Sequence, residues 1–353
     1  MFPKIRKIFF FNLILVSTLL MAGNRITLNL TKCVELGKDD FMFYSIGSVC
    51  EDNYGNFYVL DYKAYKVYKF SPEGKLILTF GNRGQGPADM ARPHSVQFTA
   101  ENNIAVCEVQ GFISFFDNNG NFLKKIRIPK GLGLKYLNDN LFYGWEWKRK
   151  SKQQVLINDK GKILKSFFEV SKDLFSVSAP DETGRMVMSN FYTQEYTPAL
   201  LFDFYKERAV IGVGNIYEIL IINKNGEVLD KIKRDVKPLE IKSKEIDYFK
   251  NEINSKKNLH DYARKKFIKK IPGCKNYFDK ILISEKYVFV FRIKEDITNE
   301  KSLIPVDIFT IKGEFVGTSA LENRPVLITG KWAYFVELSD EDLLLIKYLY
   351  TIR

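Results

Sequence analysis

A polar turn that ends in glycine and lies between two apolar runs occurs five times in this chain, and this repeat constrains the fold more than any other feature. The five glycines are Gly74, Gly120, Gly161, Gly226 and Gly313. Glycine tolerates the positive φ that closes such a turn, and the flanking residues favour strands, so each copy predicts a β-hairpin. The repetition predicts an architecture but no particular function.

A second series of hairpins alternates with the first. Its turns fall at residues 52–55, 100–103, 138–140, 181–184, 284–286 and 329–331. Away from insertions, equivalent turns recur about every 40 residues, which is the interval expected for a four-stranded antiparallel propeller blade. The fold class that we expect is therefore an all-β, six-bladed β-propeller.

The number of hairpins predicts how the ring closes. The second series has one more member than the first, and residues 343–352 supply one further strand before the chain ends. Residues 26–30 alternate apolar and polar side chains, so we expect this N-terminal strand to complete the last blade and remove a free sheet edge. Seven blades remain an alternative, because residues 199–203 and 208–212 can form an additional hairpin.

The N-terminus has the pattern of a targeting segment. Lys4, Arg6 and Lys7 precede an uncharged apolar run that ends at Ala22. This predicts a signal peptide over residues 1–23, with an uncleaved anchor as the alternative and the only source of membrane association that we predict. Residues 24–353 are then one propeller domain of a protein exported to the periplasm, the envelope or the medium, and we expect a monomer.

Residues 238–271 interrupt the strand pattern. Ser243 is a suitable helix N-cap, and Ile246, Phe249 and Ile253 recur at helical spacing, so we expect a helical insertion between blades four and five. Its apolar stripe is expected to pack on the propeller, with its lysines in water. Residues 231–270, which include most of this insertion, hold 14 Lys/Arg against six acids and so supply +8 of the net charge of +12. The candidates for contact with an anionic partner are Lys256, Lys257, Arg264, Lys265, Lys266, Lys269 and Lys270.

The segment from Phe80 to Pro87, Phe-Gly-Asn-Arg-Gly-Gln-Gly-Pro, followed by Arg92-Pro93, resembles the interblade linker of NHL-type six-bladed β-propellers. The glycines and prolines of that linker match, whereas residues 88–90, Ala-Asp-Met, depart from the Gly-Glu-Phe usual in the family. The chain is similar to the exported bacterial members, many of which have no assigned activity. The resemblance implies a fold and no chemistry.

Five residues are candidates for ligand binding. Arg83, Arg92 and His94 lie near the start of a blade and are expected at a mouth of the channel, with hydrogen bonding within the linker as the alternative. Trp145 and Trp147 form an unusual aromatic pair. Because neighbours along a strand point to opposite faces, we expect the two rings not to fill one layer, which leaves one exposed for a sugar or peptide. Packing between blades is the alternative.

Metal and thiol chemistry have few candidates. The two histidines, His94 and His260, cannot supply the histidine-ligated zinc that the resemblance implies for lyases of the family, whereas calcium remains possible because lactonase propellers bind it with carboxylates and asparagine. Residues 340–342, Asp-Glu-Asp, are either such ligands or a solvated turn. No metal ligand, catalytic residue or cofactor is predicted. The cysteines Cys33, Cys50, Cys107 and Cys274 are either paired or free thiols.

Three functions follow from these observations. The first is a binding or scaffold module that holds a peptide, protein or envelope glycan at a mouth of the central channel. The second is a metal-dependent lyase or lactone hydrolase of the propeller type. The third is a binder of an anionic envelope polymer through the basic insertion, and export argues against nucleic acid as that partner.

Overall fold

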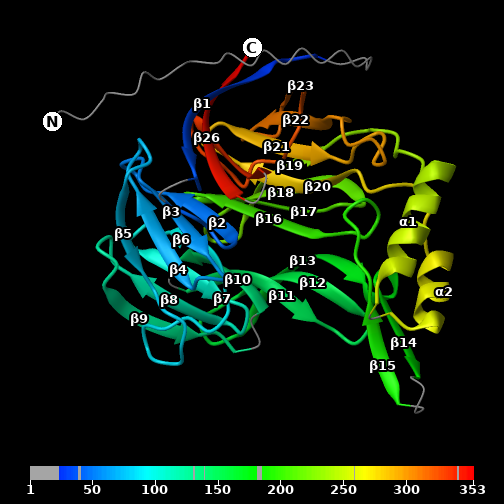
Figure 1. The fold of residues 1–353 in the computed structure, drawn as a ribbon, viewed down its shortest axis with the longest axis horizontal. Coiled ribbons are helices and arrows are strands. Elements are labelled where there is room, and N and C mark those ends of the chain that lie inside the picture. Colours follow the sequence, from blue (N-terminus) through cyan, green and yellow to red (C-terminus); the bar gives the residue numbers. More distant parts are fainter. Residues whose placement is uncertain are drawn as a thin grey trace.

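The computed structural model describes residues 24–38, 41–129, 132–138, 140–180, 185–257, 259–339 and 342–353. The segment predicted as a signal peptide, residues 1–23, lies outside them, as does most of the 340–342 acidic turn. The described chain forms a ring of four-stranded antiparallel sheets with two helices at one side (Figure 1).

Each sheet of the ring is one blade. Blade one contains β2 (Ile46–Glu51), β3 (Phe57–Asp61), β4 (Lys66–Phe70) and β5 (Leu76–Phe80). Blade two contains β6 (Pro93–Phe98), β7 (Ile104–Glu108), β8 (Phe112–Phe116) and β9 (Phe122–Arg127). Blade three contains β10 (Leu132–Asn138), β11 (Leu141–Trp147), β12 (Ser151–Ile157) and β13 (Ile163–Ser171).

The second half of the ring repeats this order. Blade four contains β16 (Leu200–Tyr205), β17 (Arg208–Val213), β18 (Ile216–Asn223) and β19 (Val228–Lys233). Blade five contains β20 (Phe278–Ile283), β21 (Tyr287–Arg292), β22 (Ile304–Thr310) and β23 (Phe315–Leu321). Blade six contains β24 (Leu327–Ile328), β25 (Trp332–Ser339), β26 (Asp342–Ile352) and β1 (Leu28–Leu36).

The two ends of the chain meet in blade six. Strand β1 pairs antiparallel with β26 from Leu28 opposite Ile352 to Leu36 opposite Leu345, and Figure 1 shows the two strands side by side. The predicted closure is therefore confirmed, although the strand spans Leu28–Leu36 rather than residues 26–30. A cluster that joins Val49 and Phe57 of blade one to Tyr334 and Leu345 of blade six packs across the seam.

All five repeat glycines close turns between the two outer strands of a blade. Their φ angles lie between +74° and +88°, for Gly74, Gly120, Gly161, Gly226 and Gly313. A residue with a Cβ is strained in this region, which explains why the sequence repeats glycine at this point.

One predicted hairpin has a different place in the fold. The strands that flank residues 181–184 are β14 (Ser176–Pro180) and β15 (Met186–Asn190), and they form a separate two-stranded sheet rather than part of blade four. Blade four instead begins with the β16–β17 hairpin, which the sequence offered as a seventh blade. The ring has six blades. Apolar alternation predicts a hairpin but not the sheet that it joins, and Met186 and Met188 are exposed.

The predicted helices are α1 (Ser243–Ser255) and α2 (Asp261–Lys269), between blades four and five. Lys242 rather than Ser243 is the N-cap of α1. Their apolar stripe packs chiefly on the segment around β14 and β15, not on the blades as expected. Phe249, Ile253 and Phe267 share one buried cluster with Val177 and Phe191. We call β14, β15, α1 and α2, with the short 3-10 helix Lys172–Leu174, the lateral lobe (Figure 1).

Candidate functional site

The first strand of each blade faces the centre of the ring. Hydrogen bonds join these strands between neighbouring blades: the Ser48 hydroxyl donates to the Val96 carbonyl (3.3 Å), and the Gln97 side chain bonds both backbone groups of Tyr136. Asp203 likewise accepts from the Ile283 amide at 2.8 Å. These hydrogen bonds hold the innermost strands of neighbouring blades against one another.

One end of the ring carries the linkers between blades, and we call it the linker face. Because the strands of a blade are antiparallel, the β3–β4 loop (62–65) and the β5–β6 linker (81–92) lie at this same end, together with the β7–β8 loop (109–111). Loops from different blades converge there, as at the binding faces of other propellers.

Buried acids hold the linkers in place. The Asp61 carboxylate, at the end of β3, accepts from the amides of Tyr44 and Ser45 in the segment that enters blade one. Glu108, at the equivalent end of β7, accepts from the amides of Ala91 and Arg92 at 2.7 and 3.1 Å. Both acids are 0% exposed. They fix the backbone from which the linker-face side chains project.

The glycine-rich linker folds around Asp89. This carboxylate accepts from the Gly86 amide at 2.9 Å, and a Cβ on Gly84 would lie 2.2 Å from the same carboxylate. Met90 is fully buried against both blades. Glycine is therefore needed at Gly84 because the Asp89 carboxylate approaches the linker backbone closely.

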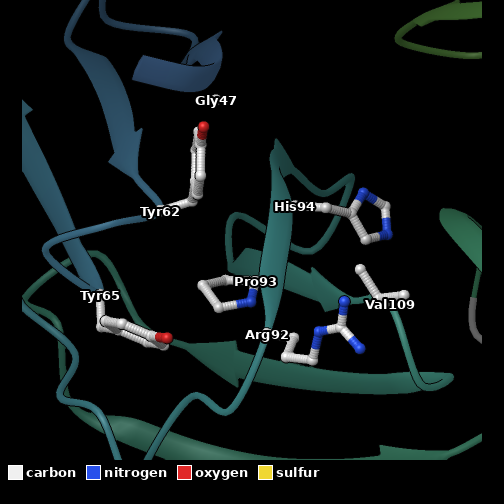
Figure 2. Close-up of a pocket in the computed structure, with 7 residues that line it drawn as sticks. All are labelled: Gly47, Tyr62, Tyr65, Arg92, Pro93, His94 and Val109. Atoms are coloured by element: carbon white, nitrogen blue, oxygen red, sulfur yellow. The ribbon is translucent and has the colours of Figure 1, made fainter. Parts of the chain in front are cut away.

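A cavity of about 460 Å3 opens on the linker face between blades one and two. It is lined by Gly47, Tyr62, Tyr65, Arg92, Pro93, His94 and Val109 (Figure 2). Arg92 immediately precedes β6, and its side chain and that of His94 extend to the same side of this segment (Figure 2). The cavity thus combines two aromatic rings with a cation and an imidazole.

The basic side chains at the cavity differ in charge and in position. Burial, aided by the nearby Lys135 charge, lowers the pKa of His94 to about 3, so the imidazole is neutral at physiological pH. Arg92 is exposed and forms no ion pair within the described part of the chain. Arg83 does not line the cavity; its guanidinium lies 5.4 Å from the centre of the Tyr65 ring, which it supports from outside. The structure therefore brings Arg92 and His94 together in the cavity and places Arg83 against the Tyr65 ring instead.

The first strands of three blades carry a group of charges that sequence analysis did not single out. Lys135, Asp203 and Lys280 occupy the innermost strands of blades three, four and five. Burial lowers the pKa of Lys135 and brings that of Lys280 to about 8, and burial raises the pKa of Asp203 to about 6. Each shift disfavours the charged form, as expected inside a channel enclosed by protein. Clusters of shifted pKa values mark functional sites more often than other surfaces.

Asp279 precedes Lys280 and has a partner. The Arg324 guanidinium binds its carboxylate through two nitrogens at 2.8 and 2.6 Å. Burial nevertheless raises the pKa of Asp279 to about 6, since desolvation outweighs the attraction of Arg324. Because the Asp279–Arg324 pair has no net charge, it does not offset the positive charges of Lys135 and Lys280.

The tryptophan pair is arranged differently from the prediction. Trp145 and Trp147 are two residues apart on β11, so they share one face, and the expectation that they could not do so was wrong. The Lys152 ammonium lies over both rings, at 3.7 Å from the centre of Trp145 and 5.4 Å from that of Trp147. Trp147 is 44% exposed, whereas Trp145 packs partly against the cluster between blades three and four. Neither lines the cavity.

The basic candidates lie on the lateral lobe. Five of them are exposed, and two are half-buried. Arg264 pairs with Asp261, Lys256 pairs with Glu252, and Lys270 donates to the carbonyls of Asp173 and Ser176. Lys257, Lys265, Lys266 and Lys269 have no ion pair within the residues that the structure describes. Those four are the part of the set with charge available to a partner.

Three further observations bear on chemistry. In the described ranges, no three His, Cys, Asp or Glu side chains gather as a metal site requires. All four cysteines are free, with Cys50 and Cys107 buried and Cys33 and Cys274 exposed. Neither helix of the described chain has the length and hydropathy needed to cross a bilayer.

The sequence contained one pattern that could have identified the buried acids of the linker face, and the sequence analysis did not use it. Asp61 and Glu108 each follow an apolar strand directly, which marks a recurring acid at the end of a second strand. Lys135, Asp203 and Lys280 had no such signal, because a single polar residue in an alternating strand looks the same whether it faces the channel or solvent.

Comparisons with known proteins agree with the ring. A family model described as a 6-bladed beta-propeller matches residues 36–317. A Bacteroides fragilis protein named as an exported protein is 12% identical, with a TM-score of 0.54 over 93% of this chain and 95% of its own. A member of the DUF4221 family from Bacteroides vulgatus is also 12% identical, with a TM-score of 0.51 over 93% and 99%.

A third structure, virginiamycin B lyase from Staphylococcus aureus, is 12% identical over 92% of this chain and 99% of its own, with a TM-score of 0.43. At these identities the likenesses show the fold alone. No curated protein matches the chain. The NHL-type linker and the family model both indicate a six-bladed propeller. The family that the model describes is not the NHL family, so that part of the resemblance is not confirmed.

Proposed function

We propose that this chain, which belongs to the DUF5128 family of six-bladed β-propellers, is an exported binding module that holds a peptide, protein or envelope glycan at its linker face. The observation that carries the proposal is the cavity between blades one and two, into which an unpaired arginine and a neutral histidine open. Export is supported by the pattern of residues 1–23 and by a structural neighbour named as exported.

The cavity suits an amphipathic ligand. Tyr62 is 41% exposed and presents a ring face, which stacks on sugar rings or peptide side chains. The Arg92 guanidinium offers a planar set of hydrogen-bond donors. Because Arg92 has no ion pair among the described residues, it does not have to leave an internal partner when it binds a ligand. The buried Glu108 carboxylate accepts from the amides of Ala91 and Arg92, so the backbone around Arg92 needs little ordering when a ligand binds.

The experiment is a binding screen by calorimetry against panels of envelope glycans and short peptides. Arg92→Ala and Tyr62→Ala are each expected to weaken the best ligand at least tenfold. Arg127→Ala is the matched control, because Arg127 is an exposed arginine on β9, the outer strand of the same blade. Equal affinity in all four proteins, or no ligand in either panel, would overturn the proposal.

A metal-dependent lyase or lactone hydrolase is the competing class, and no arrangement of the described side chains favours it. Elemental analysis of the purified protein separates the two. Stoichiometric calcium or zinc, with turnover of a lactone or cyclic depsipeptide that is lost on chelation, would replace the binding proposal with the enzymatic one.

A second candidate function has a specific observation of its own. Lys257, Lys265, Lys266 and Lys269 project from the lateral lobe without acidic partners among the described residues, as expected of a surface for an anionic envelope polymer. Replacing Lys265, Lys266 and Lys269 by Gln should weaken binding to a polyanionic glycan and flatten its salt dependence. The matched control replaces Lys160, Lys162 and Lys312, three exposed lysines of the ring. Equal losses in the two triple variants would contradict this function.

A further inference from the structure

The linker-face cavity and the loops beside it present positive charge to solvent. Arg92 is the one charged side chain among the seven residues that line the cavity, because the His94 imidazole is neutral. Lys63 and Arg83, in the loop and the linker that border the cavity, are also exposed and have no ion pair within the described chain. The volume of about 460 Å3 lies within the range of about 300–1,000 Å3 that is typical of small-molecule sites.

The acids of the same segments do not balance these cations. Asp61 and Glu108 are 0% exposed, and both accept from backbone amides of the segments that enter their blades. Glu108 also pairs with the Lys125 ammonium at 2.7 Å. Asp89 is half-buried and accepts from the Gly86 amide at 2.9 Å. Since each carboxylate has partners inside the fold, the charge left at the surface is positive and complements an anion.

The Tyr62 ring is held in one position at the cavity. It packs on the backbone of Gly47, where an added Cβ would lie 3.1 Å from the ring Cδ1 atom. The Tyr62 amide donates to the Ser45 carbonyl at 3.1 Å, which fixes the main chain as well. The ring is nevertheless 41% exposed. A fixed aromatic ring that is open to solvent is suited to stacking on the apolar face of a pyranose.

Tyr65 occupies a strained position in the same cavity. Its φ is +57°, in the left-handed region that a bulky residue rarely adopts. Blade two has Gly111, with φ of +84°, at the corresponding place directly before its third strand. Blade one thus has an aromatic ring where glycine would relieve the strain. That ring lines the cavity and lies 5.4 Å from the Arg83 guanidinium, as expected where the side chain itself has a role.

The arrangement of these groups indicates the shape of the ligand. Figure 2 shows Pro93 between the two tyrosines and the Arg92 side chain, so a ligand that fills the cavity meets aromatic rings at one end and a cation at the other. A peptide would also need acceptors for its N–H groups, and the carboxylates nearby are already bonded to amides of the fold. A sugar with an acid substituent fits this lining better.

On the basis of the proposed function, we infer that the ligand of the cavity is an acidic glycan, in which a pyranose ring stacks on Tyr62 and a carboxylate or sulfate group binds Arg92. The guanidinium donates two parallel N–H groups to two oxygens of the acid, a geometry common to both kinds of acid. Lys63 and Arg83 attract further acid groups of the same glycan, so affinity falls as ionic strength rises.

The test is calorimetric titration with acidic trisaccharides, each paired with the neutral trisaccharide of the same linkage. The acidic set contains trimers of galacturonate, glucuronate and mannuronate and a sulfated galactose trimer. At least one acidic trimer should bind tenfold or more tighter than its neutral counterpart. A dominant sulfated trimer identifies sulfate as the acid group, and a dominant uronate identifies carboxylate.

Three variants assign the acid group to its site. Arg92→Gln should reduce the affinity of the acidic trimer to that of the neutral trimer and leave the neutral trimer unchanged. Tyr62→Ala should weaken both trimers by the same factor. Arg127→Gln, on the outer strand of the same blade, is the matched control and should change neither. Because all three side chains are exposed, thermal unfolding should show that the variants keep the Tm of the parent protein.

The inference and the proposed function fail in different ways. Equal affinity for acidic and neutral trimers, lost in Tyr62→Ala, would overturn the acidic glycan and leave the binding module. An acidic peptide of equal charge that binds more tightly than every acidic trimer would do the same. An acid preference that survives Arg92→Gln but is lost when Lys265, Lys266 and Lys269 are replaced by Gln would move the site to the lateral lobe and overturn the inference. No binding of any trimer or of either screening panel would overturn both.

Discussion

Replacing Glu245 by Gln is expected to destabilise the lateral lobe selectively. The Glu245 carboxylate is fully buried at the start of α1 and binds the Lys275 ammonium at 2.5 Å. It also accepts from the amides of Lys242 (2.9 Å) and Ile297 (3.1 Å). Ile297 belongs to the β21–β22 connection of blade five, so one carboxylate joins the lobe to the ring.

The magnitude follows from what the substitution leaves behind. Removing one partner of a buried ion pair costs about 3–5 kcal/mol, because the remaining charge is uncompensated. Lys275 keeps two acceptors, the carbonyls of Lys294 (3.2 Å) and Glu295 (2.8 Å). We therefore expect about 3 kcal/mol for Glu245→Gln, at the low end of that range. Lys275→Met should cost about as much, since Glu245 is then left charged with two amide donors.

The double variant decides between a coupled pair and two separate contacts. With both charges removed, no buried charge is left unpaired, so the loss should fall short of the sum of the single losses by about 2 kcal/mol or more. Hydrogen exchange of the α1 amides and urea unfolding of all four proteins measure the cycle. Additive losses, or a loss below about 1 kcal/mol in Glu245→Gln, would refute the reasoning.

Three further predictions concern the ring. The pKa of Asp203 lies near 6 in the folded protein against an ordinary value of 3.8, so the unfolded chain releases this proton first and stability falls as pH rises from about 4 to 6. Asp203→Asn should then raise the unfolding free energy by about 1–2 kcal/mol at pH 7.5 after allowance for channel water, and by nothing near pH 4 in urea titrations; an equal gain at both values would contradict this. Gly161→Ala and Gly313→Ala both force a left-handed Cβ, but at Gly161 the Cβ would lie 2.4 Å from the Pro129 carbonyl oxygen, against 3.5 Å or more at Gly313. Gly161→Ala should therefore lower the Tm further in thermal unfolding, and the reverse order would be inconsistent with the turn geometry. Deleting residues 24–36 leaves the edge of β26 unpaired and should produce aggregates in size-exclusion chromatography, whereas a stable monomer would show that β1 is dispensable for closure.

Most of the fold could be predicted from the repeating turns in the sequence. Glycine at a fixed place in each turn is required by backbone geometry, so the pattern identified the outer hairpins of five blades correctly. The same logic placed the hairpin around 181–184 in blade four. It failed because a hairpin records pairing between adjacent segments, while membership of a sheet depends on contacts with distant ones. The β14–β15 hairpin packs against α1 and α2 instead of joining a blade.

The candidate site was recovered only in part. Arg92 and His94 were found because the glycine-rich linker locates a blade boundary, and side chains near a boundary reach the linker face. Tyr62 and Tyr65 come from a different loop, and no local pattern says that it meets that linker. Lys135 and Lys280 are 145 residues apart in the sequence, and both act electrostatically on Asp203 only because the ring closes. Such convergence is a property of the assembled sheets.

The most direct test of the binding proposal is hydrogen exchange of the protein with and without the ligand selected in the calorimetric screen. The account predicts slower exchange at residues 44–47, 62–65, 83–94 and 109–111, with the outer strands of the blades unchanged. Protection confined to α1 and α2, or distributed over the outer strands, would contradict a ligand held at the linker face.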